Sequence, residues 1–119
     1  MGYLYYGNYP LLYEIGRSEA IRSLGTSYKY LEDEMGVMMP VVMVTSKYRS
    51  PVYYDELITI ETRLEMMPTK LIHFHHSIFN ENDKLIHTGE VKLFFVDAKT
   101  NQRVSTPKVL VDLLKPYFE

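Results

Sequence analysis

The residues best placed for chemistry are the tyrosines and backbone N–H groups at the start of a well-marked helix. Asn8 is a good N-cap, Pro10 suits the first turn and Gly25 suits the position after the last turn, which together predict a helix over residues 9–24. A helix N-terminus presents unpaired N–H groups and a partial positive charge, which can hold a phosphate or a developing oxyanion. An aromatic staple around the helix entry is the more common account of the same tyrosines, namely Tyr3, Tyr5, Tyr6 and Tyr9. The residues alone leave both interpretations open.

The four histidines are a second group with suitable chemistry, because imidazole is a common zinc ligand. His73 and His75 share a strand face two residues apart, and His76 and His87 are close in sequence or on the next strand. No carboxylate spacing supplies a third ligand. We therefore expect no catalytic metal, and no other cofactor.

Composition narrows the class of protein. A chain of 119 residues with 46% hydrophobic content predicts one domain over residues 1–119, large enough to bury a core. The absence of cysteine excludes disulfides, thiol nucleophiles and thiolate metal sites. The formal net charge is −2 and the charges are interspersed, so there is no cationic surface for nucleic acid, and no signal peptide or apolar run of transmembrane length is visible. We expect a cytoplasmic protein without nucleic-acid or membrane partners.

The long helix must position the tyrosines, and its inward stripe indicates how. Leu12, Gly16, Ala20 and Leu24 recur at four-residue spacing, and the two small residues would let another backbone approach closely. This pattern favours a helix lying flat on a sheet. Two further helices are predicted, one over residues 26–35 with Tyr30, Leu31 and Met35 facing inward, and one opened by Thr106 and Pro107 and ending near residues 115–116.

Alternation of apolar and polar residues predicts three strands, over residues 37–49, 57–66 and 71–79, and residues 85–97 are long enough for a fourth strand that crosses the whole sheet. In the first strand, Val42, Val44, Ser46 and Tyr48 share one face, and Val41 lies on the other. Gly89 in the last strand is a plausible bulge. Short turns between strands imply antiparallel neighbours, and a long helix on one face of an antiparallel sheet gives an α+β domain.

Two motifs carry a resemblance to a known family. The first is Gly2-Tyr3-Leu4-Tyr5-Tyr6-Gly7-Asn8-Tyr9, followed by Tyr13-Glu14, Gly16-Arg17 and Arg22, and the second is Tyr48-x-x-Pro51-x-x-x-Asp55. In order and spacing they resemble the hot-dog-fold acyl-CoA thioesterases of the 4-hydroxybenzoyl-CoA thioesterase type, over nearly the whole chain. The resemblance implies a curved antiparallel sheet wrapped around the long helix, homodimers or homotetramers, and hydrolysis of acyl-CoA to free acid and CoA without a metal or redox cofactor.

The resemblance also implies the catalytic groups. The backbone N–H of Tyr6, with that of Gly7 as a second donor, would polarise the thioester carbonyl at a subunit interface. The family's catalytic aspartate lies on a first strand that would precede Met1, so we expect this strand and its aspartate to be missing and the chain as given to turn over poorly. Glu14 is the internal carboxylate that could replace the aspartate, and a structural pairing with arginine is the alternative role for it.

Coenzyme A requires cations for its phosphates, and Lys47, Arg49 and Lys70 are the candidates. A solvated basic edge that discourages association between sheets is the alternative account of these residues. Two other functions stay open. One is a non-catalytic acyl-CoA-binding or oligomeric interaction module on the same fold, and the other is a hot-dog dehydratase, which would need a histidine and acid pair.

Overall fold

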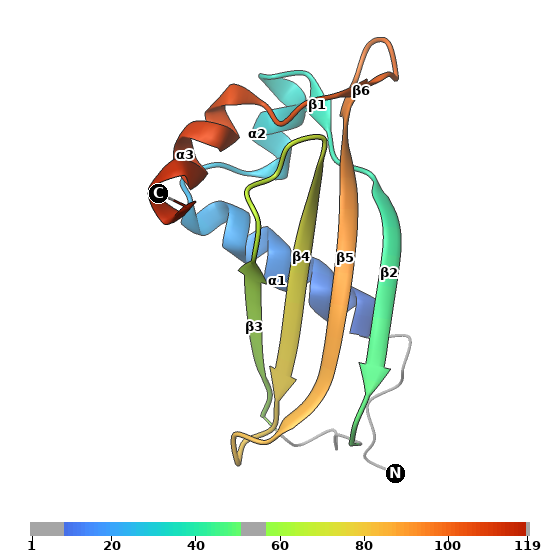
Figure 1. The fold of residues 1–119 in the computed structure, drawn as a ribbon, viewed down its shortest axis with the longest axis vertical. Coiled ribbons are helices and arrows are strands. Elements are labelled where there is room, and N and C mark those ends of the chain that lie inside the picture. The colour runs from blue at the N-terminus through green and yellow to red at the C-terminus, as the bar shows by residue number, and fades with distance from the viewer. Residues whose placement is uncertain (1–8, 51–56, 119) are drawn as a thin grey trace.

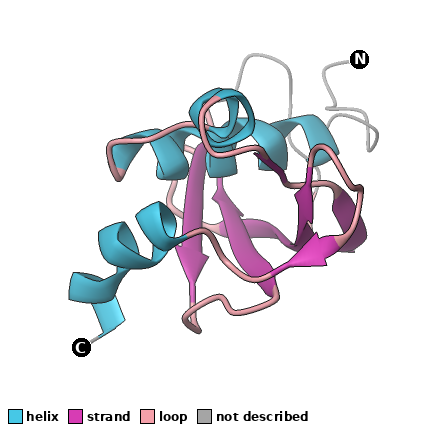
Figure 2. Cartoon of the chain, turned by 90° about the horizontal axis from the view of Figure 1, so that it is seen from above, coloured by secondary structure: helices cyan, strands magenta, loops and turns pink. Residues whose placement is uncertain are grey.

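The computed structural model describes residues 9–50 and 57–118, which form a curved antiparallel sheet with a long helix on one face (Figures 1 and 2). The helices are α1 (Tyr9–Ser23), α2 (Tyr28–Asp33) and α3 (Lys108–Phe118). The strands are β1 (Val37–Met38), β2 (Val41–Tyr48), β3 (Thr59–Leu64), β4 (Leu71–Phe79), β5 (Leu85–Asp97) and β6 (Arg103–Val104). The predicted α+β class is confirmed, as are the predicted bounds of the two longest strands.

β5 organises the sheet because it is long enough to pair with four other strands. β4 and β2 flank it, and β3 lies beyond β4, so the main strands run in the order β2, β5, β4, β3 (Figure 1). The short strands β1 and β6 pair with the last residues of β5. All of these pairings are antiparallel. Within the described residues, β2 and β3 are therefore the two edges of the main sheet.

The predicted strand over residues 37–49 is instead two strands, with Pro40 between them. Proline has no N–H to donate to a ladder, which explains the interruption. The register also shifts near the start of β2, where Val41 pairs with Leu93 but Met43 pairs with the adjacent residue Lys92. This bulge reverses the alternation, so Val41 lies on the same face as Val44, contrary to the expectation from sequence.

The small residue in the middle of α1 has the predicted role. A Cβ on Gly16 would lie 2.5 Å from Oγ1 of Thr62 and 3.2 Å from Ile60, both on β3, so a larger residue would push the helix off the sheet. α1 ends just before Gly25, which has a φ of 98°. Its core partners include Ile72, Phe74 and Phe95 on β4 and β5.

The two other helices differ in detail from the predictions. In α2, Ser27 is the N-cap and Leu31 is fully buried, but Tyr30 and Met35 are each 44% exposed, contrary to the expected inward orientation. This helix is only six residues long, and one turn buries only one side chain fully. α3 continues through Pro116 to Phe118. The proline removes one i→i−4 hydrogen bond from the last turn, and the helix ends two residues later. No helix in residues 9–50 and 57–118 is long and apolar enough to cross a membrane.

Candidate active site

Four aromatic rings pack together where the first turns of α1 meet the inner face of the sheet. They are Tyr9 and Tyr13 on α1, His76 on β4 and His87 on β5, which we call the tyrosine–histidine cluster. Tyr9 stacks on His87 with ring centroids 3.8 Å apart, and Tyr13 stacks on His76 at 4.9 Å. All four residues are buried. The cluster fixes the N-terminal part of α1 against the sheet.

Hydrogen bonds connect this cluster to the neighbouring strands. The Tyr13 hydroxyl lies 2.8 Å from Oγ of Ser46 on β2 and also bonds Nε2 of His87. Nδ1 of His76 lies 2.9 Å from the hydroxyl of Thr62 on β3. If the Tyr13 hydroxyl donates to Nε2, the proton of neutral His87 lies on Nδ1. Each of the four main strands thus contributes one residue to these three hydrogen bonds.

Burial keeps the cluster uncharged at neutral pH. It lowers the pKa of His87 to about 4. It also lowers the pKa of His76 to about 4, with a further contribution from the positive charge of Arg17. Burial raises the pKa of the Tyr13 hydroxyl, which stays protonated. At pH 7 the two imidazoles are neutral and weakly basic. The cluster is therefore suited to positioning the helix and not to accepting a proton.

The side chain of Tyr48 marks the solvent side of this cluster. Its ring packs edge-on against Tyr9, with centroids 5.4 Å apart, and against His87 at 4.7 Å. Tyr48 is 47% exposed, whereas the cluster residues are at most 2% exposed. Among the described residues, Tyr48 is therefore the exposed neighbour of this cluster. The stacking of His76 and His87 against the tyrosines of α1 was not predicted from the sequence. The sequence indicated burial only for His76, which lies on the apolar face of β4.

Two of the predicted catalytic residues, Tyr6 and Gly7, lie outside the described residues, as do Pro51 and Asp55 of the second motif. Glu14 lies on α1 and is exposed. Burial raises the pKa of the nearby Tyr28 hydroxyl most strongly, and the positive charge of Arg17 lowers it. The negative charge of Glu14 adds a smaller increase to the same pKa. The arrangement places Glu14 and Arg17 near the same tyrosine.

The three basic residues predicted to bind phosphates lie at two ends of the sheet. Lys47 is exposed on β2 opposite Thr88, and Arg49 follows that strand, with its backbone N–H donating to the carbonyl of Ile86 at 3.0 Å. Lys70 precedes β4 at the other end, where it lines a cavity of about 240 Å³ with Arg103. Within one chain the structure brings Lys47 and Arg49 together but not Lys70.

A larger cavity of about 360 Å³ lies near the C-terminal end of α1, away from the tyrosine–histidine cluster. Ala20 and Leu24 of α1, Leu64 of β3, Phe74 of β4 and Tyr117 of α3 are among its lining residues. This apolar space was not predicted, because it depends on how α3 packs beside β3. It carries no pair of titratable groups suited to hydrolysis.

The histidines do not form one metal centre in the described structure. His76 and His87 face α1, whereas His73 and His75 alternate with them and lie on the outer face of the sheet. On that outer face the register places Glu90 opposite His75. A carboxylate that could act as a third metal ligand therefore lies beside His73 and His75, although the spacing along the sequence did not indicate one.

Comparison with known proteins agrees with this architecture. A family model for the Thioesterase-like superfamily matches residues 1–114. YneP of Bacillus subtilis, which is named provisionally as an acyl-CoA thioesterase, is 37% identical over 113 residues, covering 94% of this chain and 80% of that protein. The acyl-CoA thioester hydrolase YbgC of Escherichia coli O6:H1 is 28% identical over 110 residues, covering 92% of this chain and 81% of that protein.

Solved structures extend the comparison to the fold. The DHNA-CoA thioesterase of Staphylococcus aureus superposes with a TM-score of 0.86 at 28% identity, covering 98% of this chain and 78% of that chain. Another protein of the same organism, solved in complex with CoA, has a TM-score of 0.88 at 17% identity, covering 99% and 74% of the two chains, and shares the fold. The chain therefore belongs to the Thioesterase-like superfamily and has its hot-dog fold.

Proposed function

We propose that the chain is a cytoplasmic acyl-CoA thioesterase of the 4-hydroxybenzoyl-CoA thioesterase type, acting as a single hot-dog domain. Membership of the superfamily supports this proposal, as do relatives named for hydrolysis of acyl-CoA or DHNA-CoA thioesters. The observation that carries it is the tyrosine–histidine cluster, because this cluster holds the start of α1 rigidly against the sheet. A fixed helix N-terminus is a preorganised place for a developing oxyanion.

In the proposed reaction, the backbone N–H groups of Tyr6 and Gly7 polarise the thioester carbonyl. A carboxylate then deprotonates a water that attacks the carbonyl carbon, and the thiolate of CoA leaves and takes up a proton, which gives the free acid and CoA. In the alternative route the carboxylate itself attacks, the thiolate leaves, and water hydrolyses the resulting mixed anhydride to the free acid and the regenerated carboxylate. Loss of one oxyanion donor typically costs about 2.7–4 kcal/mol of transition-state stabilisation. Within this sequence Glu14 is the carboxylate that we propose, because it lies early on α1 and is exposed to water.

The test is turnover on a panel of short-chain, medium-chain and aromatic acyl-CoA thioesters, with two variants at one position. Tyr6→Pro removes the backbone N–H, whereas Tyr6→His changes only the side chain. We expect Tyr6→Pro to reduce kcat about 100-fold to 1,000-fold on the best substrate and Tyr6→His to stay close to the parent. Equal losses in the two variants would show that the side chain, not the N–H group, is what matters.

A non-catalytic acyl-CoA-binding or oligomeric interaction module is the second candidate, and one observation favours it. In residues 9–50 and 57–118, no carboxylate forms a hydrogen bond or ion pair with Tyr13, His76 or His87. Binding of CoA without turnover of any thioester on the panel would support this module. The same panel, run on a version of the chain begun further upstream in its gene, separates a true binding module from an incomplete enzyme.

We also propose that the protein works as a homodimer or homotetramer in which sheets join at β2. Within the described residues this strand is an edge, and it exposes an unusual number of apolar side chains on both faces, namely Val41, Val42, Met43, Val44 and Tyr48. Exposed apolar edge strands readily pair with another chain. A dimer formed there would bring a second subunit beside the start of α1.

A further inference from the structure

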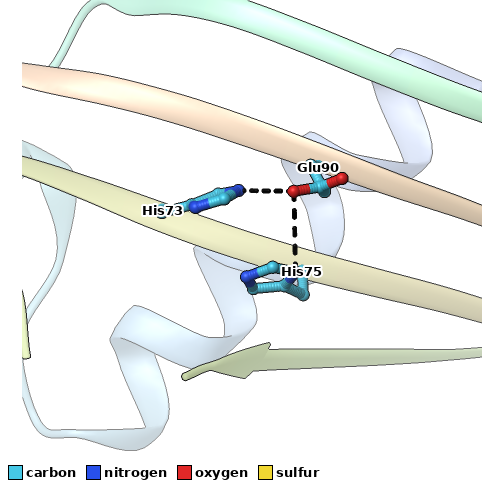
Figure 3. A group of neighbouring side chains, drawn as sticks. All are labelled: His73, His75 and Glu90. Carbon is cyan, nitrogen blue, oxygen red and sulfur yellow. Dashed lines mark hydrogen bonds and ion pairs between the residues drawn. The ribbon is translucent and has the colours of Figure 1, made fainter. Parts of the chain in front are cut away.

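The outer face of the sheet carries a second cluster of ionisable side chains. It lies on the opposite face of the sheet from the tyrosine–histidine cluster and includes a carboxylate. Figure 3 shows His73 and His75 of β4 pointing toward Glu90 of β5. Nε2 of His73 lies 2.8 Å from Oε1 of Glu90, and Nδ1 of His75 lies 3.9 Å from the same oxygen. The three potential ligand atoms lie within 4.8 Å of one another.

These distances suit a small divalent cation. Zinc binds imidazole nitrogen and carboxylate oxygen at about 2.0–2.2 Å in a tetrahedral arrangement, which places ligand atoms roughly 3.3 Å apart. The two observed separations, 2.8 and 3.9 Å, lie on either side of that value. Small side-chain rotations on two neighbouring strands would therefore bring the three ligand atoms to coordination distance from one ion without any change in the backbone.

A carboxylate outside the triad lies beside one of the ligands. Nε2 of His75 lies 3.4 Å from Oε2 of Glu65, on the side of the ring opposite the Nδ1 that faces Glu90. Histidines that ligate metals usually donate their other N–H to a carboxylate, which sets the tautomer and makes the ligating nitrogen more basic. Glu65 lies at ion-pair distance from Nε2 of His75, so a closer approach would let it accept that N–H while Nδ1 ligates an ion.

The chain has few other nitrogen or sulfur ligands that could compete for zinc. There are no cysteines, and the two remaining histidines are buried in the tyrosine–histidine cluster. The side chains of His73, His75 and Glu90 are 28%, 18% and 40% exposed, so an ion can reach them and a water can complete its coordination. Two imidazoles and one carboxylate suit zinc and neighbouring transition metals better than calcium or magnesium, which prefer oxygen ligands alone.

We propose that His73, His75 and Glu90 form a binding site for one divalent transition-metal ion of the zinc class on the outer face of the sheet, with Glu65 as the orienting residue. The three ligands lie on the face of the sheet that points away from α1 and the tyrosine–histidine cluster, and His75 and Glu90 share a cavity of about 200 Å³ with Lys47, one of the cations proposed for CoA. A bound ion would fasten β4 to β5. The proposal does not depend on whether the chain hydrolyses thioesters.

The test is Zn²⁺ binding to the whole protein, prepared without a polyhistidine tag and measured by calorimetry and by competition with a chromogenic chelator. We expect one ion per chain, at least a tenfold weaker affinity in His75→Gln and Glu90→Gln, and a 10-fold to 100-fold weaker affinity in Glu65→Gln. Glu61→Gln is the matched control, because Glu61 is an exposed carboxylate on β3 that pairs with Arg63 but is not in the triad. Equal Zn²⁺ binding by the parent and Glu90→Gln would overturn the proposal.

Cobalt binding to the unmodified chain keeps the test independent of how well the variants fold. Co²⁺ in the site should broaden or shift the ring proton signals of His73 and His75 in NMR spectra and leave those of His76 and His87 much less affected. Uniform effects on all four histidines, or none, would show that these side chains serve only as polar links between strands.

Discussion

The ring of Tyr13 lies directly over the α-carbon of Gly89, so closely that a Cβ at that position would overlap the ring. Gly89 pairs in regular register with Ser46 on one side and His76 on the other, and it is therefore not the bulge that its sequence suggests. Its missing side chain makes room for Tyr13, whose hydroxyl then reaches Ser46 and His87. One glycine on β5 thus determines how closely α1 approaches the sheet.

Gly89→Ala should destabilise the protein because the added methyl group must displace the Tyr13 ring. Overpacking of this kind costs about 1–3 kcal/mol, and loss of the hydroxyl's hydrogen bonds would add to that cost. The measurement is the free energy of unfolding in urea. Thr88→Ala is the control, because Thr88 is the preceding residue and lies on the outer face of the sheet, opposite to the face that Tyr13 covers. Similar losses in the two variants would contradict the proposed overlap.

Stability should decrease in weak acid because of the two buried histidines. Their pKa values are about 4 in the folded protein, against an ordinary value of 6.5, so the unfolded chain binds more protons between those values. Stability is therefore fully present above pH 6.5 and is lost as the pH falls toward 4, by at most about 1.4 kcal/mol per pH unit for each histidine.

Urea unfolding at several pH values between 7.5 and 4.5 measures this slope, and His76→Gln should reduce it by about half. Asp97 acts in a lower range, because backbone N–H groups of Thr100 and Lys99 lower the pKa of its carboxyl. Its contribution is lost only as the pH falls below the ordinary range of an aspartate. An unchanged slope in His76→Gln would assign the acid sensitivity to other groups.

Local patterns were sufficient to predict most of the fold. The apolar face of residues 71–79 and the length of the segment 85–97, separated by a short polar turn, gave two strands whose bounds the structure reproduces. The errors arise where a single residue interacts with a distant element. Pro40 and the bulge beside it alter β2, and the role of Gly89 depends on a tyrosine 76 residues earlier in the chain.

The candidate sites were harder to predict, because sheet register brings their residues together. Spacing along the chain placed His73 and His75 on one face but could not show that Glu90 lies across from them. In the same way, His87 meets Tyr9 and Tyr13 only because α1 crosses the sheet at that point. The placement of Tyr6 and Gly7 at the thioester remains a prediction that rests on the resemblance.

Glu14→Gln separates a catalytic role of Glu14 from a structural one. We expect kcat to fall about 100-fold or more, the range for a lost general base, while the unfolding free energy changes little because the side chain is exposed. Glu19→Gln is the control, since Glu19 lies on the same helix but pairs with Arg22 at 2.7 Å. Retained turnover with a loss of stability would indicate instead that Glu14 has a structural role beside Arg17 and Tyr28.

Charged substitutions on the β2 edge should dissociate the proposed oligomer. Val42 and Val44 are each 45% exposed, and a lysine at either position would be buried without a partner in a sheet-to-sheet interface. Light scattering after gel filtration should show Val44→Lys as a monomer at concentrations where the parent is a dimer or tetramer. Met66→Lys is the control, because Met66 is 77% exposed and lies outside β2. If both variants keep the parent mass, the interface lies elsewhere.

Charge reversal of Lys47 and Arg49 should weaken CoA binding if the nucleotide phosphates lie at the end of β2. Both residues are exposed and near one another, so together they can contact one phosphate group, and we expect the dissociation constant to rise at least tenfold in Lys47→Glu/Arg49→Glu. Lys70→Glu tests the opposite end of the sheet, where Lys70 and Arg103 share a cavity. A loss in the double variant alone places the phosphates beside β2, and a loss in Lys70→Glu alone places them beside β6. A loss in both would require the two ends to meet across a subunit boundary, because the length of the sheet separates them within one chain. Unchanged affinity in both variants would remove all three cations from the binding site.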